Sequence, residues 1–457
     1  MDSGDEPRGN RWWLVFAAGA AVFMAQFDVT VVNVALPTIE RDFGTSTSVT
    51  EWVILGYVLP LIALTLPSGR WLEGIGRRAA MVFAVGGFAT ASVAVGLAGD
   101  ISWLIAARAT QGAFGAVLFA LVPVLATIAV PPENRGKAMA IVMTLGPLGG
   151  VSGPALGGVL IDTIGWSWIF YVNVPVAALI LIAAVTQLPR GTRVHLPGRA
   201  WLTETGVLGA ATVALLLSLS LTAEHGIAWL ALAPAAVPFL LVWRQLPSSE
   251  PVKELLRAPG MSGPHFALLL EMAAVLAVQF LLPFHLHRTG ATPTEVGLIL
   301  LAFPAGVMLF GILGGVLTDR WNGRSIATIG AVTVVLGLLL TMPLDPEWAA
   351  ADLAWRLGVA GAGAGLFAGP NQTVAMNTAP QHLLNTTGAT TSVARQLGIA
   401  LGPALVTASW ALSGDDAMRW SVGLAAVLAM LSALALVRRT PRRTKTELEP
   451  TTERTSA

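Results

Sequence analysis

Long apolar runs separated by short polar stretches dominate the pattern of the chain. The runs are about 17 to 28 residues long, close to the ~20 residues that a helix needs to cross a bilayer. They do not alternate apolar and polar positions as the strands of a membrane β-barrel do, and Val207–Leu217 and Val332–Leu340 are examples. The pattern therefore predicts fourteen helical membrane spans, at 13–36, 52–68, 80–98, 103–130, 138–161, 168–188, 206–222, 227–243, 266–284, 296–317, 326–343, 353–376, 388–412 and 419–437.

Composition agrees with this interpretation and excludes several other classes. Only 12% of the 457 residues are charged and 54% are hydrophobic, against about 25% charged residues in an average soluble domain. So few charges cannot cover the surface of a soluble protein of this size, and no excess of basic residues exists for binding nucleic acid. The absence of cysteine excludes a disulfide scaffold and thiol catalysis. We predict an all-α polytopic membrane protein.

The distribution of basic residues predicts the orientation of the chain. The chain has 27 lysines and arginines. Three lie in loops on one side of the membrane (Arg41, Arg288, Arg419), and three lie within predicted spans (Arg108, Arg356, Arg395). The rest lie in the loops and tails on the opposite side. Basic loops stay in the cytoplasm, so both termini are expected on the cytoplasmic side. The membrane is expected to be the cytoplasmic membrane of a bacterium. The first apolar run has no cleavage site after it, and we interpret it as a span and not as a signal peptide.

Features of the chain recur at a nearly constant offset of 246 to 249 residues. The repeated pairs are Leu36-Pro37 with Leu282-Pro283, 69–78 with 315–324, Arg108 with Arg356, and 153–156 with 402–405. Four matches in order predict two related six-helix halves, with two further helices inserted between them. The expected organisation is a cytoplasmic N-terminus (1–12), an N-terminal half (13–190), inserted helices with linkers (191–260), a C-terminal half (261–437) and a disordered cytoplasmic tail (438–457).

Four sequence motifs resemble those of a known transporter family. They are 28–37 (DVTVVNVALP), the loop 69–78 with its copy at 315–324, Leu104-x3-Arg108-x2-Gln111-Gly112, and Gly149-x3-Gly153-Pro154-x2-Gly157-Gly158. Together they resemble the fourteen-helix drug:proton antiporter branch of the major facilitator superfamily, over nearly the whole chain. The resemblance implies the major facilitator fold, no enzymatic activity and no cofactor. It also implies export of lipophilic or cationic drugs in exchange for protons, as in multidrug efflux and antibiotic resistance.

Asp28 is the first candidate for proton coupling. It lies about 15 residues into the first span, which at ~1.5 Å per residue places it ~22 Å from the cytoplasmic end. An ionised carboxylate at that depth is costly unless it is paired, so intramembrane acids are rare and often functional. The alternative is a structural aspartate that hydrogen-bonds to Thr30, Asn33 or a neighbouring helix.

Three more charges are expected near Asp28. Arg108 and Arg356 each need an acid, carbonyl groups or water within reach because guanidinium groups stay charged. Glu271 corresponds by the repeat offset to Ala25, on the same helical face as Asp28. The resemblance implies that the four helices concerned line one cavity. We therefore hypothesise that the two acids face the two arginines as proton-responsive pairs; the alternative is a set of fixed salt bridges.

Glycine and proline in the fifth span suggest a tight seam between the halves. Glycines spaced four apart allow close helix packing, and proline permits a bend. Ordinary helix packing is the alternative for this set, which comprises Gly149, Gly153, Pro154, Gly157 and Gly158.

The two related loops are candidates for a gate on the cytoplasmic side. Their charges are suited to hold the gate closed, although a solvated basic loop is the alternative. The residues are Gly69, Glu73, Gly76, Arg77 and Arg78 in the first loop, and Gly315, Asp319, Arg320, Gly323 and Arg324 in the second.

Several other functions lack support in the sequence. No Glu, Asp or Cys is spaced to complete a metal site with His285 and His287, and no hydrolase, zinc-protease or ATP-binding motif is present. We expect a monomeric exporter whose partners are a small molecule, protons and the lipid bilayer, and no nucleic acid. The alternatives are a dedicated exporter of one metabolite or antibiotic, and a proton-coupled uptake symporter.

Overall fold

All regular elements in the described part of the chain are helices. The computed structural model describes residues 11–72, 75–131, 135–191, 194, 197–344, 349–413 and 417–437. The helices are α1 (Trp12–Phe43), α2 (Thr47–Thr50), α3 (Trp52–Leu72), α4 (Arg77–Gly96), α5 (Ile101–Ile128), α6 (Arg135–Ile164), α7 (Trp168–Tyr171), α8 (Asn173–Gln187), α9 (Arg199–His225), η2 (Ile227–Ala235), α10 (Ala236–Gln245), η3 (Pro247–Ser249), α11 (Glu250–Arg257), α12 (Ser262–Arg288), α13 (Pro293–Arg320), α14 (Gly323–Thr341), α15 (Ala350–Thr378), η4 (Gln381–Leu383), α16 (Leu384–Ser413) and α17 (Ala417–Val437). The predicted all-α class is confirmed.

Eleven helical segments of the described residues are long and apolar enough to cross a membrane. The other three predicted spans, 138–161, 353–376 and 388–412, fall on α6, α15 and α16, which have 30, 29 and 30 residues. Glycine, alanine and polar side chains make α15 and α16 less apolar than their neighbours, and α6 contributes the shorter apolar segment Leu148–Ile164. The total of fourteen spans therefore stays a prediction.

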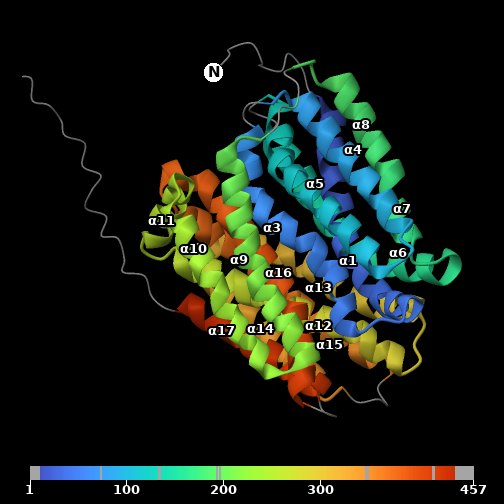
Figure 1. Ribbon diagram of the computed structural model, residues 1–457. Coiled ribbons are helices and arrows are strands. Elements are labelled where there is room, and N and C mark those ends of the chain that lie inside the picture. The colour runs from blue at the N-terminus through green and yellow to red at the C-terminus, as the bar shows by residue number, and fades with distance from the viewer. Residues whose placement is uncertain are drawn as a thin grey trace, which may run out of the picture.

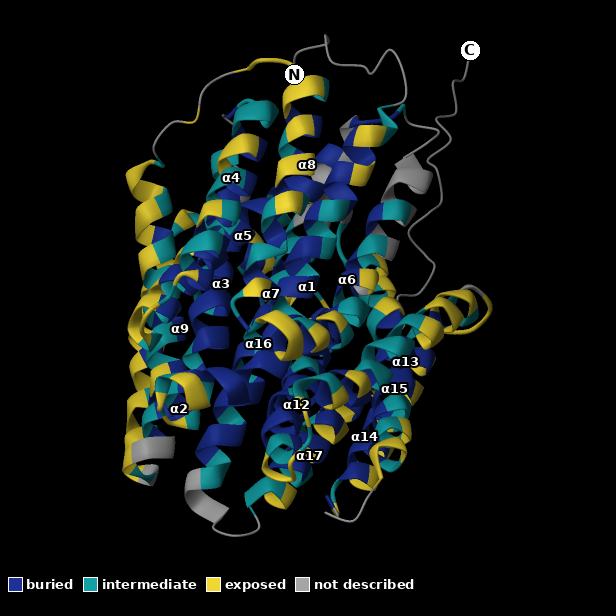
Figure 2. Cartoon of the chain, turned by 90° about the vertical axis from the view of Figure 1, so that its right-hand side faces the viewer, coloured by how far each residue is buried: buried dark blue, intermediate teal, exposed yellow. Residues whose placement is uncertain are grey.

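The helices form two groups with a third, smaller set beside them. α1 packs on α6, α5 and α8, and α3 packs on α5, whereas α12 packs on α16 and α17, and α15 packs on α13 and α14. α9 lies against both α3 and α16, in front of the other helices in Figure 1 and at the left edge of the molecule in Figure 2. Helix α9 thus contacts both groups along one edge, and α10 packs on α9.

Helices in the interior of the molecule are the most buried, and helices at its edge are the most exposed (Figure 2). Among the apolar segments long enough to cross a membrane, those of α1, α3 and α12 are buried to the largest extent, while α10 exposes Leu240, Leu241 and Val242 by 46–51%. An exposed apolar face of this kind matches lipid and not water. α11 differs, because it buries Val252 and Leu255 and pairs the exposed Glu250 with Lys253.

Glycines bring helix backbones into direct contact in both groups. A Cβ on Gly112 of α5 would collide with the carbonyl oxygen of Tyr57 on α3. A Cβ on Gly361 of α15 would collide in the same way with Phe303 on α13. Small residues at crossings let membrane helices pack without a gap, and these contacts fix the frame that holds the charged groups.

Candidate functional site

A buried polar network centres on Asp28 of α1, which is fully buried. Its Oδ2 accepts a hydrogen bond from Nη1 of Arg108 on α5 at 2.5 Å, in an ion pair. Its Oδ1 accepts from Nε2 of Gln111 at 2.9 Å and from Nδ2 of Asn173 on α8 at 3.0 Å. Three donors therefore surround a single carboxylate, and the bond from Arg108 joins two charged groups.

Arg108 is equally enclosed. Nε donates to the carbonyl of Val53 on α3 at 3.0 Å, and Nη1 also donates to Oε1 of Gln111 at 2.6 Å. Its guanidinium carbon lies 4.4 Å from the centre of the Tyr57 ring, a cation–π contact. Gln111 and Asn173 both reach Ser92 of α4. The network therefore joins α1, α3, α4, α5 and α8.

The sequence indicated part of this network. The pairing of Asp28 with Arg108 is the contact that the charges predicted. Gln111 is part of the motif that begins at Leu104, but the motif predicted no role for it. Ser92 and Asn173 were not predicted as site residues. The available signal was a polar side chain inside an apolar run, a pattern that many structural residues share.

Glu271 of α12 has a different environment. It is fully buried, Ser432 of α17 is the polar side chain next to its carboxylate, and no described residue forms an ion pair with it. The hydroxyl of Ser432 donates to the carbonyl of Ala267 at 3.0 Å. Glu271 is thus an unpaired acid inside the C-terminal group.

The hypothesis that Glu271 faces Arg356 is wrong. Arg356 lies in the second turn of α15, where Nη1 donates to the carbonyl of Asp352 at 2.5 Å and lies 3.6 Å from the Asp352 carboxylate. Its guanidinium also stacks on Trp355. The physical reason is local, because an acid four residues earlier on the same helix supplies a counter-charge near the helix end.

The glycine residues of α6 pack against two different helices, α1 and α13. Gly149, Gly153 and Gly157 meet α1, where a Cβ would collide with Phe23, Thr30 and Val31 in turn. Gly158 instead faces α13 of the other group, and a Cβ there would lie 2.5 Å from the carbonyl of Pro293. The predicted close packing is present, but most of it lies within the N-terminal group and only its end joins the halves.

Further contacts join the two groups at the end predicted to face outward. Asp162, at the end of α6, accepts from the backbone N–H of Thr294 at 2.8 Å and also pairs with its hydroxyl. A Cβ on Gly297 of α13 would collide with the carbonyl of Pro154. The halves are therefore packed together at this end.

The predicted gate loops are described only in part. Glu73 lies outside the described residues, as does the side chain of Asp319. Gly76 immediately precedes α4, and Arg77 and Arg78 lie in its first turn. In the second loop the side chain of Asn322 caps α14 by accepting from the N–H of Arg324 at 2.9 Å. Their role as a gate stays a prediction. Residues 1–10 of the predicted N-terminus 1–12 and the whole predicted tail 438–457 also lie outside the described residues.

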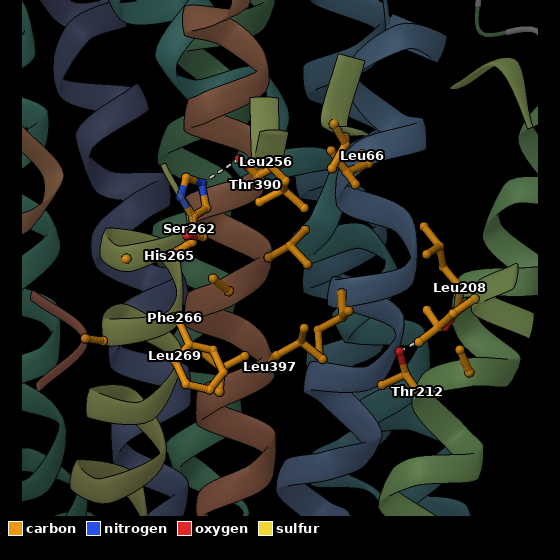
Figure 3. Close-up of a pocket in the computed structure, with 18 of the residues that line it drawn as sticks. Leu66, Leu208, Thr212, Leu256, Ser262, His265, Phe266, Leu269, Thr390 and Leu397 are labelled. Atoms are coloured by element: carbon orange, nitrogen blue, oxygen red, sulfur yellow. Dashed lines mark hydrogen bonds between the residues drawn. The ribbon is translucent and has the colours of Figure 1, made fainter. Parts of the chain in front are cut away.

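A cavity of about 960 Å³ lies where α9, α10 and α11 meet α12, α16 and α17. Its wall is mostly apolar, with Leu66, Leu208 and Leu397 pointing into it (Figure 3). The polar wall includes His265, whose Nδ1 donates to the carbonyl of Met261 at 2.8 Å and whose Nε2 lies 2.9 Å from Oγ1 of Thr390. Its lining includes none of the four predicted charges, so a cavity that these charges share stays a prediction.

The comparison with protein families identifies the fold and its general function. Residues 18–403, and in a second overlapping match 264–456, match the Major Facilitator Superfamily. The chain belongs to this family. The transporter is also similar to a crystal structure of a D-xylose–proton symporter, with a TM-score of 0.68, 15% identity, and coverage of 94% of this chain and 98% of the other. That likeness confirms the predicted major facilitator fold.

Named relatives narrow the class of the transporter. It is 32% identical over 467 residues to the methylenomycin A resistance protein of Streptomyces coelicolor, covering 96% of this chain and 94% of that protein. It is 31% identical over 416 residues to multidrug resistance protein Stp of Mycobacterium tuberculosis, covering 87% and 76%. It is 30% identical over 424 residues to puromycin resistance protein pur8 of Streptomyces alboniger, covering 88% and 82%. The prediction of a multi-pass membrane transporter for small molecules, and not an enzyme, is confirmed.

Proposed function

We propose that this transporter is a proton-coupled exporter of lipophilic or cationic compounds, of the fourteen-helix drug:proton antiporter type. Both termini lie in the cytoplasm in this proposal, and the transporter works as a monomer by alternating access between its halves. The relatives that carry resistance to several drugs or to single antibiotics support export. The apolar cavity of about 960 Å³ is compatible with a lipophilic compound.

The observation that carries the proposal is the enclosed ion pair of Asp28 and Arg108. A proton on Asp28 removes the charge that Arg108, Gln111 and Asn173 hold in place. Arg108 then loses its counter-charge and the contact between α1 and α5 weakens. Binding of a proton at one carboxylate thereby changes how five helices are held together, which is the link that coupled transport needs.

Transport measurements in inverted membrane vesicles test this proposal. Ethidium, a lipophilic cation, should accumulate in the vesicles only when a proton gradient is imposed, and its addition should release protons from them. Asp28→Asn should insert into the membrane at a similar level, because the amide oxygen still accepts from Arg108, but should lose gradient-driven uptake. Uptake by this variant at the wild-type rate would refute the coupling role.

A dedicated exporter of one antibiotic is the second candidate. The antibiotic-specific names of two relatives favour it. Competition distinguishes the two, because a broad exporter should show ethidium uptake inhibited by chemically unrelated lipophilic cations. Inhibition by a single compound class would favour the dedicated exporter. Gradient-driven uptake into intact cells, and not into inverted vesicles, would indicate a symporter.

A further inference from the structure

Glu51 is a buried acid between the two halves. It takes no part in the ion pair of Asp28 and Arg108. It follows α2 directly and precedes α3, and it is fully buried. Its Oε2 lies within hydrogen-bond distance of the hydroxyl of Thr407 on α16, in the other half. Its Oε1 has no hydrogen-bond partner among the described residues. This carboxyl group therefore lies in the interface that is closed at the predicted outer end.

The hydroxyl of Thr407 has only one proton to donate. Besides Glu51, it lies 3.1 Å from the carbonyl oxygen of Ala404 and 3.3 Å from that of Pro403. A threonine in a membrane helix commonly donates to a carbonyl of the preceding turn. If Thr407 does so here, its oxygen is available as an acceptor, and the proton between Thr407 and Glu51 must come from the glutamate.

Within the described part of the chain, no positive charge pairs with Glu51. The charged and titratable groups on the helices packed against this turn are Asp28, Glu40, Arg41 and Asp42 on α1, Tyr57 on α3, Arg108 on α5, Arg199, Glu204 and His225 on α9, and Arg395 on α16. Among the described residues, none of these forms an ion pair or hydrogen bond with Glu51. Burial of an ionised carboxylate without a counter-charge in a dry interface is costly, and protonation of the carboxylate removes this cost.

We propose that Glu51 is a proton-binding site between the halves, occupied when the outer end is closed and emptied when it opens. In the closed state the O–H of Glu51 donates to Oγ1 of Thr407, which donates to the carbonyl of Ala404. Opening separates α3 from α16 and admits water, and the proton then leaves for the outside solution. The proposal rests on the proposed alternating access and adds a step: closing the outer end requires an external proton.

A distance measurement between the halves tests this site without relying on transport. The chain has no cysteine, so Thr163→Cys on α6 and Thr289→Cys after α12 introduce the two labelling positions alone. Both positions are exposed and lie at the predicted outer end. Spin labels on this pair, in the full-length protein in lipid nanodiscs, report the separation of the halves. We would titrate from about pH 5 to about pH 9, which brackets the protonation of buried carboxyl groups.

The expected result is a short distance at low pH and a growing population of a longer one as the pH rises. Glu51→Gln should keep the short distance at every pH, because its amide donates to Thr407 and cannot ionise. Asp162→Asn is the matched control, since Asp162 is an exposed acid in the same interface, and it should keep the pH dependence. A wild-type protein without pH dependence, or a Glu51→Gln variant that retains it, would overturn the proposal.

Variants of Thr407 cover the case in which Glu51→Gln fails to fold. Thr407→Val removes the acceptor of the Glu51 proton and should lower the midpoint pH of opening by about one unit, the equivalent of one lost hydrogen bond. Thr407→Ser keeps the hydroxyl and should restore the midpoint. An unchanged midpoint in Thr407→Val would contradict the proposed donor and acceptor. A failure of gradient-driven ethidium transport with this titration intact would refute the proposed function but not the site.

Discussion

Each half encloses a buried acid, and the two acids differ in the partners that surround them. Asp28 is held by Arg108, Gln111 and Asn173, whereas no described residue forms an ion pair with Glu271. A proton on Asp28 therefore disrupts existing contacts, while a proton on Glu271 removes a charge that nothing compensates. The comparison teaches that a shared fold and a sequence repeat do not imply shared electrostatics.

Substitution of the two arginines related by the repeat, Arg108 and Arg356, should give the largest difference in stability between the halves. Arg108→Met leaves Asp28 as a buried charge without a cation and should lower the free energy of unfolding by about 3–5 kcal/mol. Arg356→Met removes a partly exposed pair within one helix and should cost about 0–1 kcal/mol. Thermal unfolding of the purified protein in detergent measures both. Equal losses in the two variants would break the comparison between the halves.

Packing of α6 gives a smaller effect, confined to the N-terminal group. Gly153→Leu forces a side chain into Thr30 and should destabilise the protein by about 1–3 kcal/mol and slow ethidium uptake. Gly150→Ala is the control on the same helix, because a Cβ there has its nearest neighbour at 4.0 Å. Normal uptake rates in both Gly153→Leu and Gly157→Leu would show that close packing here does not matter for transport.

Glu271 gives the smallest and most selective effect. Glu271→Gln removes an uncompensated charge, so its stability should equal or slightly exceed that of the wild type. Uptake of cationic ethidium should fall about fivefold, the equivalent of ~1 kcal/mol, while uptake of a neutral dye changes little. Arg356→Lys serves as the control, since it leaves the acid in place. Equal uptake of both dyes by Glu271→Gln at wild-type rates would exclude a role in substrate charge recognition.

Sequence patterns predicted the fold well because bilayer thickness constrains helix length directly. The apolar runs locate the helices, and a lone acid such as Asp28 in a 20-residue apolar run is visible without a structure. Contacts between helices were harder to predict. The partner of Arg356 is Asp352, four residues away on α15, and the repeat offset concealed this local pairing.

Glu51 illustrates a second limit of prediction from sequence. It lies next to Trp52 at the start of an apolar run, where an acid is usually solvated at the membrane surface. Its burial depends on α16, which begins more than 300 residues later in the chain. Only the assembled halves show that this acid is enclosed.

The contacts of α6 also have a mechanical consequence. Its glycines hold it against α1 at backbone distance, so the two helices cannot slide past each other without steric collision. α1 carries Asp28, and the far end of α6 touches α13 through Gly158. In the proposed coupling, a shift of α1 after a change in charge at Asp28 would pass through this stiff pair of helices to the opposite half, as a displacement at Pro293 and not as a local adjustment of side chains.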